Sequence, residues 1–259
     1  MTILETIIEN KKKEIVQSKK LVSLIELKEQ PYFNRTCLNF PEAIMTGTGI
    51  ISEFKRKSPS KGLINGKVSV QEVVSGYAKA NVSAVSVLTD TKFFGGTFND
   101  VLLARETIDV PILRKDFMVD EYQLHEAKAM GADVILLIAS ALSVNQTNEL
   151  ASAAKSLGLN VFLEIHNHDE LAHFGSDIDV VGINNRDLKT FTIDIENSIR
   201  LSKELPTNVP KVAESGISSP ETLLKMKNEG FNGFLIGENF MRSENPGKSC
   251  KEFIDACAI

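Results

Sequence analysis

Charged and amide side chains follow several short apolar runs of this chain, at the point where each run ends. Five of eight such runs end in this way, and the residues are Glu53 and Lys55, then Lys115, Glu164, Asn184 and Glu214. Lysine and glutamate held together can donate and accept protons on one substrate. Any single one of these residues could belong to a structural ion pair. Because buried charges are costly unless they are paired, all of them together indicate an acid–base site.

A basic loop follows the first run. It reads Lys55-Arg56-Lys57-Ser58-Pro59-Ser60-Lys61-Gly62. Its hydroxyls, ammonium groups and backbone N–H groups suit a substrate that carries anionic groups. Since strand side chains alternate with a period of two, Glu53 and Lys55 share one face with Ile51. Taken alone, this stretch fits an edge strand with a solvated charged end equally well, and the later runs favour the site.

Two small turns follow the last two runs. They contain Ser215 with Gly216 and Gly237 with Glu238. Small residues let backbone N–H groups approach an anion, so these turns predict a phosphate site. Glycine is common in any turn, and its placement after both late runs is what favours phosphate.

Aromatic side chains occur in two loops near the same ends. Phe93 and Phe94 precede Gly95 and Gly96, and Phe117 follows Lys115. Together the rings predict an apolar slot for a planar ring. The alternative is that these rings only anchor their loops.

Three histidines lie close together in the sequence. His166 and His168 alternate near the end of one run, and His173 follows. A metal site needs a further clear ligand and supporting partners, and the sequence offers neither. We therefore expect no metal.

The apolar runs alternate with segments of helical pattern. The runs are Ile50–Phe54, Ala84–Leu88, Val110–Leu113, Val134–Ile138, Asn160–Ile165, Val180–Ile183, Pro210–Ala213 and Gly233–Ile236. The clearest helices are Val70–Ala80, Glu121–Met130, Val144–Leu157 and Pro220–Glu229. Eight β-then-α units predict an α/β fold, a single (β/α)8 TIM barrel, whose active site lies at the C-terminal ends of its strands. No glycine-rich dinucleotide loop follows the first run, which disfavours a doubly wound sheet.

The first residues stand outside this repeat. Apolar spacing predicts helices over Ile3–Ser18 and Leu21–Lys28. We expect one domain over residues 1–259, with residues 1–46 as an N-terminal helical extension that covers the substrate-facing rim and residues 47–259 as the barrel. The run Lys11-Lys12-Lys13 is expected on the solvated face of the first helix.

Composition excludes several classes of partner. The 259 residues are 42% hydrophobic with a formal net charge of -5, which argues against nucleic acid. The longest apolar run, Val134–Ala139, is far too short to cross a membrane. Three cysteines without a CxxC pattern indicate a reducing compartment. A cytoplasmic protein is expected.

Four stretches resemble the indole-3-glycerol phosphate synthase family of tryptophan biosynthesis. They are Ser52–Gly62, Leu113–Phe117, Gly182–Leu188 and Val212–Ile217. The resemblance covers essentially the whole chain, and its most specific part is the Ser-Pro-Ser-Lys-Gly loop after Glu-x-Lys. The Glu-Ser-Gly-Ile stretch alone occurs in several phosphate-binding barrels. The family often has asparagine where this chain has Gly95.

The resemblance implies a lyase that closes 1-(2-carboxyphenylamino)-1-deoxyribulose 5-phosphate to an indole, with loss of carbon dioxide and water. It implies that the catalytic residues are Lys115, Lys55, Glu164, Glu53, Asn184 and Glu214. It places Ser58 and Arg186 near the substrate carboxylate and hydroxyls, Phe94 and Phe117 at the anthranilate ring, and Ser215, Gly216, Gly237 and Glu238 at the phosphate. No cofactor or metal is implied. The expected partner is a small phosphorylated substrate bound by a monomer, and association with other enzymes of the pathway stays open.

Two other classes remain as alternatives. One is another phosphate-binding barrel enzyme, such as phosphoribosylanthranilate isomerase or an enzyme like ribulose-phosphate epimerase. These lack the long N-terminal extension and the loop after Glu53. The other is a barrel that binds a phosphorylated ligand without converting it. Such a barrel has no need of the paired lysines and glutamates, so their presence favours an enzyme.

Overall fold

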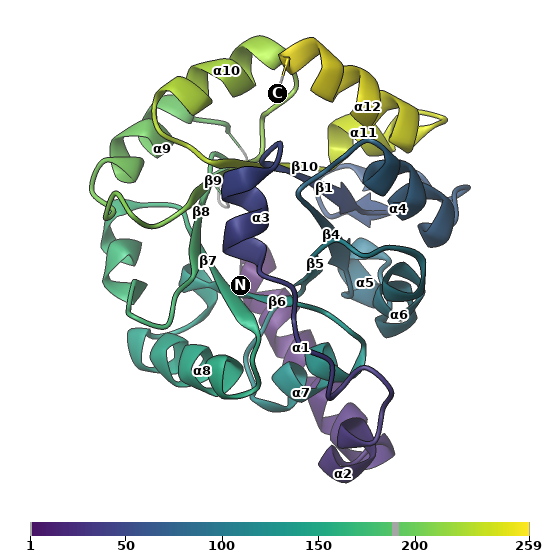
Figure 1. Ribbon diagram of the computed structural model, residues 1–259. Coiled ribbons are helices and arrows are strands. Elements are labelled where there is room, and N and C mark those ends of the chain that lie inside the picture. The colour runs from purple at the N-terminus through teal and green to yellow at the C-terminus, as the bar shows by residue number, and fades with distance from the viewer. Residues whose placement is uncertain (1, 188–191, 259) are drawn as a thin grey trace.

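Eight parallel strands close into a barrel surrounded by helices in the computed structural model, which describes residues 2–187 and 192–258 (Figure 1). The strands are β1 (Ile50–Phe54), β4 (Ala84–Leu88), β5 (Ile112–Lys115), β6 (Val134–Ile138), β7 (Asn160–Ile165), β8 (Val180–Asn184), β9 (Lys211–Glu214) and β10 (Gly233–Ile236). Each strand pairs with the next of this series, and β10 closes the barrel on β1. The predicted (β/α)8 barrel is therefore confirmed.

The predicted runs match the strands closely. Five of the eight coincide with a strand at both ends, whereas β5, β8 and β9 extend beyond the predicted end by one or two residues. In each of these three the added last residue is polar: Lys115, Asn184 or Glu214. A prediction from apolar residues ends such a strand too early, because its last residue is polar. The backbone of that residue still pairs with the neighbouring strand, while its side chain enters the site.

Helices form a ring outside the barrel, as Figure 1 shows. They are α4 (Val70–Lys79), α6 (Phe98–Thr107), α7 (Tyr122–Ala129), α8 (Val144–Ser156), α9 (Ile195–Ser202), α10 (Pro220–Asn228) and α12 (Pro246–Cys257). Shorter elements lie in the loops: α5 (Thr91–Phe94), α11 (Glu238–Met241), the 3₁₀ turns η1 (Ala139–Ala141) and η2 (His168–His173), and the β2–β3 hairpin (Lys57–Ser58 and Gly62–Leu63). Several helices begin at a serine whose hydroxyl accepts a backbone N–H, as Ser69 does for α4.

The alternation of side chains separates two apolar clusters. Ile51 of β1 belongs to the cluster inside the barrel, together with Leu113 and Phe162. Ile50 and Phe54 belong to the larger cluster between the strands and the outer helices. Because Glu53 has the parity of Ile51, its side chain points into the barrel, as the period of two predicts.

The N-terminal extension covers both ends of the barrel, not one. Helix α1 (Ile3–Leu21) lies at the end where the strands finish, and α2 (Leu24–Lys28) contacts α7. Helix α3 (Phe40–Thr46) lies across the opposite opening, in front of the barrel in Figure 1. Its Phe40 and Ile44 join the interior cluster. The expectation that the extension covers only the substrate-facing rim is therefore wrong for α3, which closes the bottom of the core.

The lysine run of α1 also differs from its prediction. Lys12 and Lys13 are exposed, but Lys11 is only 4% exposed. Its ammonium lies 3.0 Å from a carboxylate oxygen of Asp90 and 2.9 Å from one of Asp116. Lys11 thus fastens α1 to the loops after β4 and β5.

Helical spacing explains this burial. Lys11 is four residues after Ile7 and four before Ile15, and all three are buried on the face that meets the barrel. Burial alone would lower the pKa of Lys11, but Asp116 and Asp90 outweigh it and raise that pKa. The ammonium is therefore charged and compensates two buried carboxylates.

We expect Lys11→Met to lower the free energy of unfolding by about 3 kcal/mol, because it leaves Asp90 and Asp116 buried without their shared cation. Chemical denaturation measures the change. Lys12→Met is the matched control, and its effect should stay within about 0.5 kcal/mol. Equal stabilities of the two variants would contradict the anchoring role of Lys11.

Candidate active site

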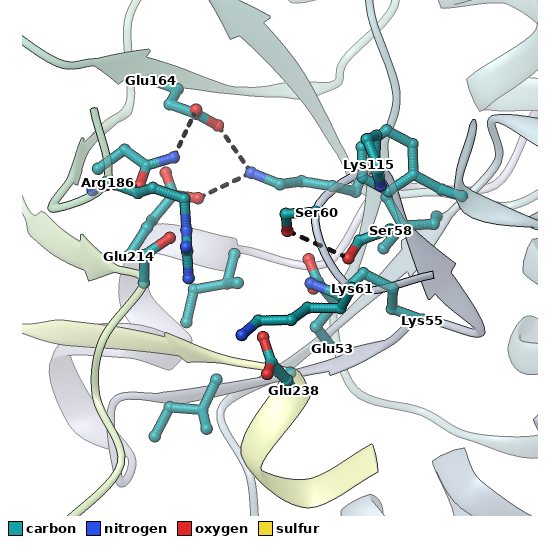
Figure 2. A pocket seen from close by; sticks show the side chains of 18 of the residues that line it. Glu53, Lys55, Ser58, Ser60, Lys61, Lys115, Glu164, Arg186, Glu214 and Glu238 are labelled. Atoms are coloured by element: carbon teal, nitrogen blue, oxygen red, sulfur yellow. Dashed lines mark hydrogen bonds and ion pairs between the residues drawn. The ribbon is translucent and has the colours of Figure 1, made fainter. Parts of the chain in front are cut away.

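A cavity of about 550 Å³ opens at the C-terminal ends of the strands. Residues from all eight barrel strands and from α1 line it, and Figure 2 shows part of them. All of the site residues named from the sequence lie in its lining: Glu53, Lys55, Ser58, Phe94, Lys115, Phe117, Glu164, Asn184, Arg186, Glu214, Ser215, Gly216, Gly237 and Glu238. The tertiary structure thus brings together residues that are up to 185 positions apart, from Glu53 to Glu238.

Lys115 occupies the centre of the charged cluster. Its ammonium donates to Glu164 and to Glu214, each at 2.7 Å (Figure 2). Burial alone would lower the pKa of Lys115, but the charges of Glu164, Glu214 and Glu53 outweigh it and raise that pKa. Lys115 therefore carries its proton throughout the neutral pH range.

The two carboxylates that hold Lys115 differ in their electrostatics. Burial would raise the pKa of Glu164, but Lys115 and His166 outweigh it and lower that pKa. For Glu214, burial and the charge of Glu164 exceed the effect of Lys115 and raise the pKa to about 7. Oε1 of Glu214 has no hydrogen-bond partner in the described part of the chain. Paired carboxylates whose pKa values are pushed apart are typical of acid–base sites.

Glu53 and Lys55 form a second ion pair beside this cluster, with Nζ 2.5 Å from Oε1. Gly237 makes room for it, because a Cβ at Gly237 would lie 2.5 Å from the same Oε1. Gly182 does the same for Glu214, where a Cβ would lie 2.3 Å from Oε1. The sequence predicted Gly237 only for backbone contact with phosphate, and the structure adds this steric reason.

The loop with Ser58 lies over the cavity as the β2–β3 hairpin. Arg56 fixes its base by two hydrogen bonds to Asp100, at 2.6 and 2.7 Å. Lys57 donates to the carbonyl oxygen of Lys92 at 2.7 Å. These bonds leave Ser58 at the cavity, where its hydroxyl is 3.5 Å from that of Ser60.

Phe94 and Phe117 approach each other at one side of the cavity. Their ring centroids are 6.0 Å apart at 38°, and both side chains are half-buried. Gly95 ends α5 in the left-handed region, with φ +70°. Asparagine, which the family often has here, is the other residue that tolerates this conformation, so the departure leaves the loop geometry unchanged.

The turn after β9 has an unusual backbone. Ser215 and Gly216 both have positive φ, 65° and 75°, and Asn185 donates to the carbonyl oxygen of Ser215 at 2.7 Å. A non-glycine residue in this region is uncommon and typical of functional turns. After β10, Glu238 pairs with Arg242 at 2.5 Å.

Several lining residues were not predicted from the sequence. Ile3, Leu4 and Ile7 of α1 close the cavity from above, and Asn239 and Arg242 extend its edge beyond Glu238. The spacing of Ile3, Leu4 and Ile7 showed one apolar face, but spacing does not reveal what covers that face. His166 was considered only as a metal ligand, although its parity places it on the same side of the chain as Glu164.

The three histidines face different partners. His166 lies between Glu164 and Glu170, His168 pairs with Glu204, and His173 hydrogen-bonds Thr147. Within residues 2–187 and 192–258 no group of three His, Cys, Asp or Glu side chains could hold a metal ion. No helix in the same part of the chain is long and apolar enough to cross a membrane.

A closed (β/α)8 barrel with lysines and carboxylates gathered at its mouth defines a barrel enzyme of the acid–base class. The family model described as indole-3-glycerol phosphate synthase matches residues 4–253. The chain belongs to this family, as its four resembling stretches predicted; Leu188 of the third stretch lies outside the described residues.

Relatives of known name support this family assignment. The chain is 48% identical over 255 residues to the indole-3-glycerol phosphate synthase of Bacteroides thetaiotaomicron, covering 98% of each chain. It is 42% identical to that of Salinibacter ruber, over 96% of this chain and 94% of the other. A mutant tryptophan synthase alpha-subunit from Pyrococcus furiosus superposes with a TM-score of 0.63 at 17% identity, over 82% of this chain and 98% of the other. That likeness shows the fold alone.

We expect Glu214→Gln to stabilise the protein at pH 8 while lowering kcat. The pKa of Glu214 rises on folding from 4.5 to about 7. Ionisation of Glu214 therefore does not lower the free energy of unfolding below pH 4.5, lowers it increasingly between pH 4.5 and 7, and lowers it by the full amount above about pH 7. The gain should be on the order of 1–3 kcal/mol at pH 8 and should disappear as the pH falls to 4.5. Denaturation at several pH values measures it. Exposed Glu9→Gln is the control, and a variant less stable than the wild type at pH 8 would refute the prediction.

Proposed function

We propose that this protein converts 1-(2-carboxyphenylamino)-1-deoxyribulose 5-phosphate to indole-3-glycerol phosphate, carbon dioxide and water. The observation that carries the proposal is the ammonium of Lys115, whose side chain is only 13% exposed and which Glu164 and Glu214 hold at the cavity. Ring closure requires a proton donor at a ketone oxygen. A lysine kept charged by carboxylates at the cavity is suited to that step.

The order of the strands supports a substrate that spans the barrel mouth. The aromatic pair Phe94 and Phe117 follows β4 and β5, and the turns with Gly216 and Gly237 follow β9 and β10, of which β9 lies opposite β5 in the barrel. A ring in the slot and a phosphate at the turns leave the ketone between them. Lys55, directly after β1, would then approach this centre from one side, and the cluster around Lys115 from the other.

The chemistry assigns a role to each charged group. The ring carbon that bears the carboxylate attacks the ketone, and the oxygen takes a proton from a lysine as the bond forms. Loss of carbon dioxide restores the aromatic ring. Dehydration then needs an acid for the departing hydroxyl and a base for the amine proton, which a second lysine and a carboxylate supply. Lys115 and Lys55 are the two donors in this proposal, with Glu164 and Glu53 as their partners.

The remaining residues orient the catalytic groups or bind the substrate in this scheme. Asn184 donates to Glu164 at 2.9 Å and so fixes the orientation of that carboxylate. Ser58 and Arg186 are proposed to contact the substrate carboxylate and hydroxyls. Ser215, Gly216, Gly237 and Glu238 are proposed to hold the phosphate, the last two through their backbone.

We also propose that the chain acts as a monomer in the cytoplasm, and that the extension and the barrel form one domain. The contacts of Lys11 with the loops after β4 and β5 support a single domain. Three unpaired cysteines, Cys37, Cys250 and Cys257, support a reducing compartment.

The indole product absorbs in the ultraviolet, so its appearance tests the proposed reaction directly. The wild type should form it. Lys115→Met should lower kcat by at least about a hundredfold while substrate still binds, because methionine keeps the length of the side chain but has no ammonium proton to donate. Lys55→Met should also lower kcat but should make a different step limiting. Solvent isotope effects and the accumulating intermediates then differ between the two variants.

Near-normal turnover of Lys115→Met would remove Lys115 from the catalytic role. Identical isotope effects and the same accumulating species in both variants would mean that the two lysines serve one step together.

The aromatic slot has its own test. Phe94→Ala and Phe117→Ala should each weaken substrate binding by on the order of 1–3 kcal/mol, the scale of a lost large apolar contact. Substrate titration measures the change, and thermal denaturation of the same variants serves as the control. Variants that bind as the wild type does but melt earlier would assign both rings to loop packing.

A further inference from the structure

His166 lies directly after β7 with 9% of its side chain exposed. Both of its ring nitrogens lie close to carboxylates. Nδ1 is hydrogen-bonded to Oε2 of Glu170 at 3.2 Å, and Nε2 is within ion-pair distance of Oε1 of Glu164, at 3.2 Å, without hydrogen-bond geometry. A neutral imidazole has a lone pair on one nitrogen, and that lone pair would face a carboxylate here. Only the imidazolium places a positive charge beside both carboxylates.

The charges around the ring agree with this state. Burial alone would lower the pKa of His166, but its contacts with Glu164 of β7 and Glu170 in η2 outweigh burial and raise that pKa to about 10. Helix α9 contributes a neutral group, the amide of Asn197, which donates to the His166 carbonyl oxygen at 3.2 Å. Lys115 of β5 lies beyond Glu164. At neutral pH the ring therefore carries a positive charge.

The imidazole is not needed to hold the turn. Glu170 already accepts the backbone N–H of His166 at 2.7 Å and the side-chain amide of Asn167 at 2.8 Å. Asn167 also caps η2. The stability of the turn therefore does not explain why the imidazole ring contacts Glu164.

Glu164 is shared by two cations. Its Oε2 accepts from Lys115 at 2.7 Å, and its Oε1 faces His166 and Asn184. The positive charge of His166 partly compensates the negative charge of Glu164, so Glu164 attracts the proton of Lys115 less strongly. The ammonium then becomes a stronger acid toward a substrate oxygen.

We propose that His166 is a positioning residue for the reaction. As an imidazolium it keeps Glu164 ionised and directed at Lys115, and it weakens the attraction of Glu164 for the proton of Lys115. The inference rests on the proposed role of Lys115 as a proton donor. It assigns to the series Glu170, His166, Glu164, Lys115 and Glu214 one alternating line of charge that ends at the cavity.

The first test is His166→Gln, which retains hydrogen-bonding capacity and removes the charge. We expect kcat to fall about tenfold or more, since a close charge shifts a neighbouring pKa by at least about one unit, with KM within about twofold. His168→Gln is the matched control, because His168 is exposed and pairs with Glu204 away from the cavity. Wild-type kcat in folded His166→Gln would overturn the proposal.

The second test does not depend on how well that variant folds. Glu170→Gln removes one counter-charge and should bring the pKa of His166 down toward neutrality, so kcat should acquire a new decline as the pH rises above about 7. The decline should be absent from the wild type below about pH 9 and from the variant with both substitutions. A Glu170→Gln profile of wild-type shape would overturn the proposal.

NMR observes the charge directly. The chain has four histidines, so single substitutions assign the imidazole signals, and the His166 ring should remain protonated at pH 7.5 in the resting enzyme. A neutral ring at that pH would overturn the inference whatever the kinetics. Failure of the wild type to form the indole would reject the proposed function instead, and the titration separates that outcome from failure of the charge assignment.

Discussion

The structure of the site depends on one largely enclosed cation, the ammonium of Lys115, and on the carboxylates that compensate it. Glu164 and Glu214 contact it directly and Glu53 adds to the field around it. Each carboxylate needs space inside a packed barrel. Gly182 and Gly237 provide that space, since a Cβ at either position would meet a carboxylate oxygen at 2.5 Å or less. The charged cluster therefore requires glycine at positions 182 and 237.

Another lysine, the buried Lys11, connects the extension to the same strand end. Successive residues of a strand point to opposite sides, so Lys115 enters the barrel while Asp116 faces α1. Asp116 accepts from Lys11 at 2.9 Å, from Thr89 at 2.6 Å and from Arg114 at 3.1 Å. Positions 115 and 116 thus serve catalysis and anchoring side by side, and the helix that closes the cavity is fixed next to the lysine at its centre.

Burial of these charges reduces stability in exchange for reactivity. A carboxylate that is buried beside another carboxylate resists ionisation, and Glu214, with its pKa raised to about 7, is the clearest case. His166 supplies an opposing charge on the far side of Glu164. The site thus alternates negative and positive groups from η2 to the cavity, which keeps the charges compensated in a region that water reaches poorly.

The sequence by itself determined the strands, the barrel and the set of residues at its mouth. Local alternation and turn residues mark where each strand ends, and in a closed parallel barrel all of these ends meet on one face. It did not determine the burial of Lys11, the place of α3 under the barrel, the partners of His166 or the steric role of Gly237. Each of these depends on a contact between distant parts of the chain, such as Lys11 with Asp116 or Gly237 with Glu53. Spacing along one element shows which residues share a face, but only the packed tertiary structure decides what that face meets.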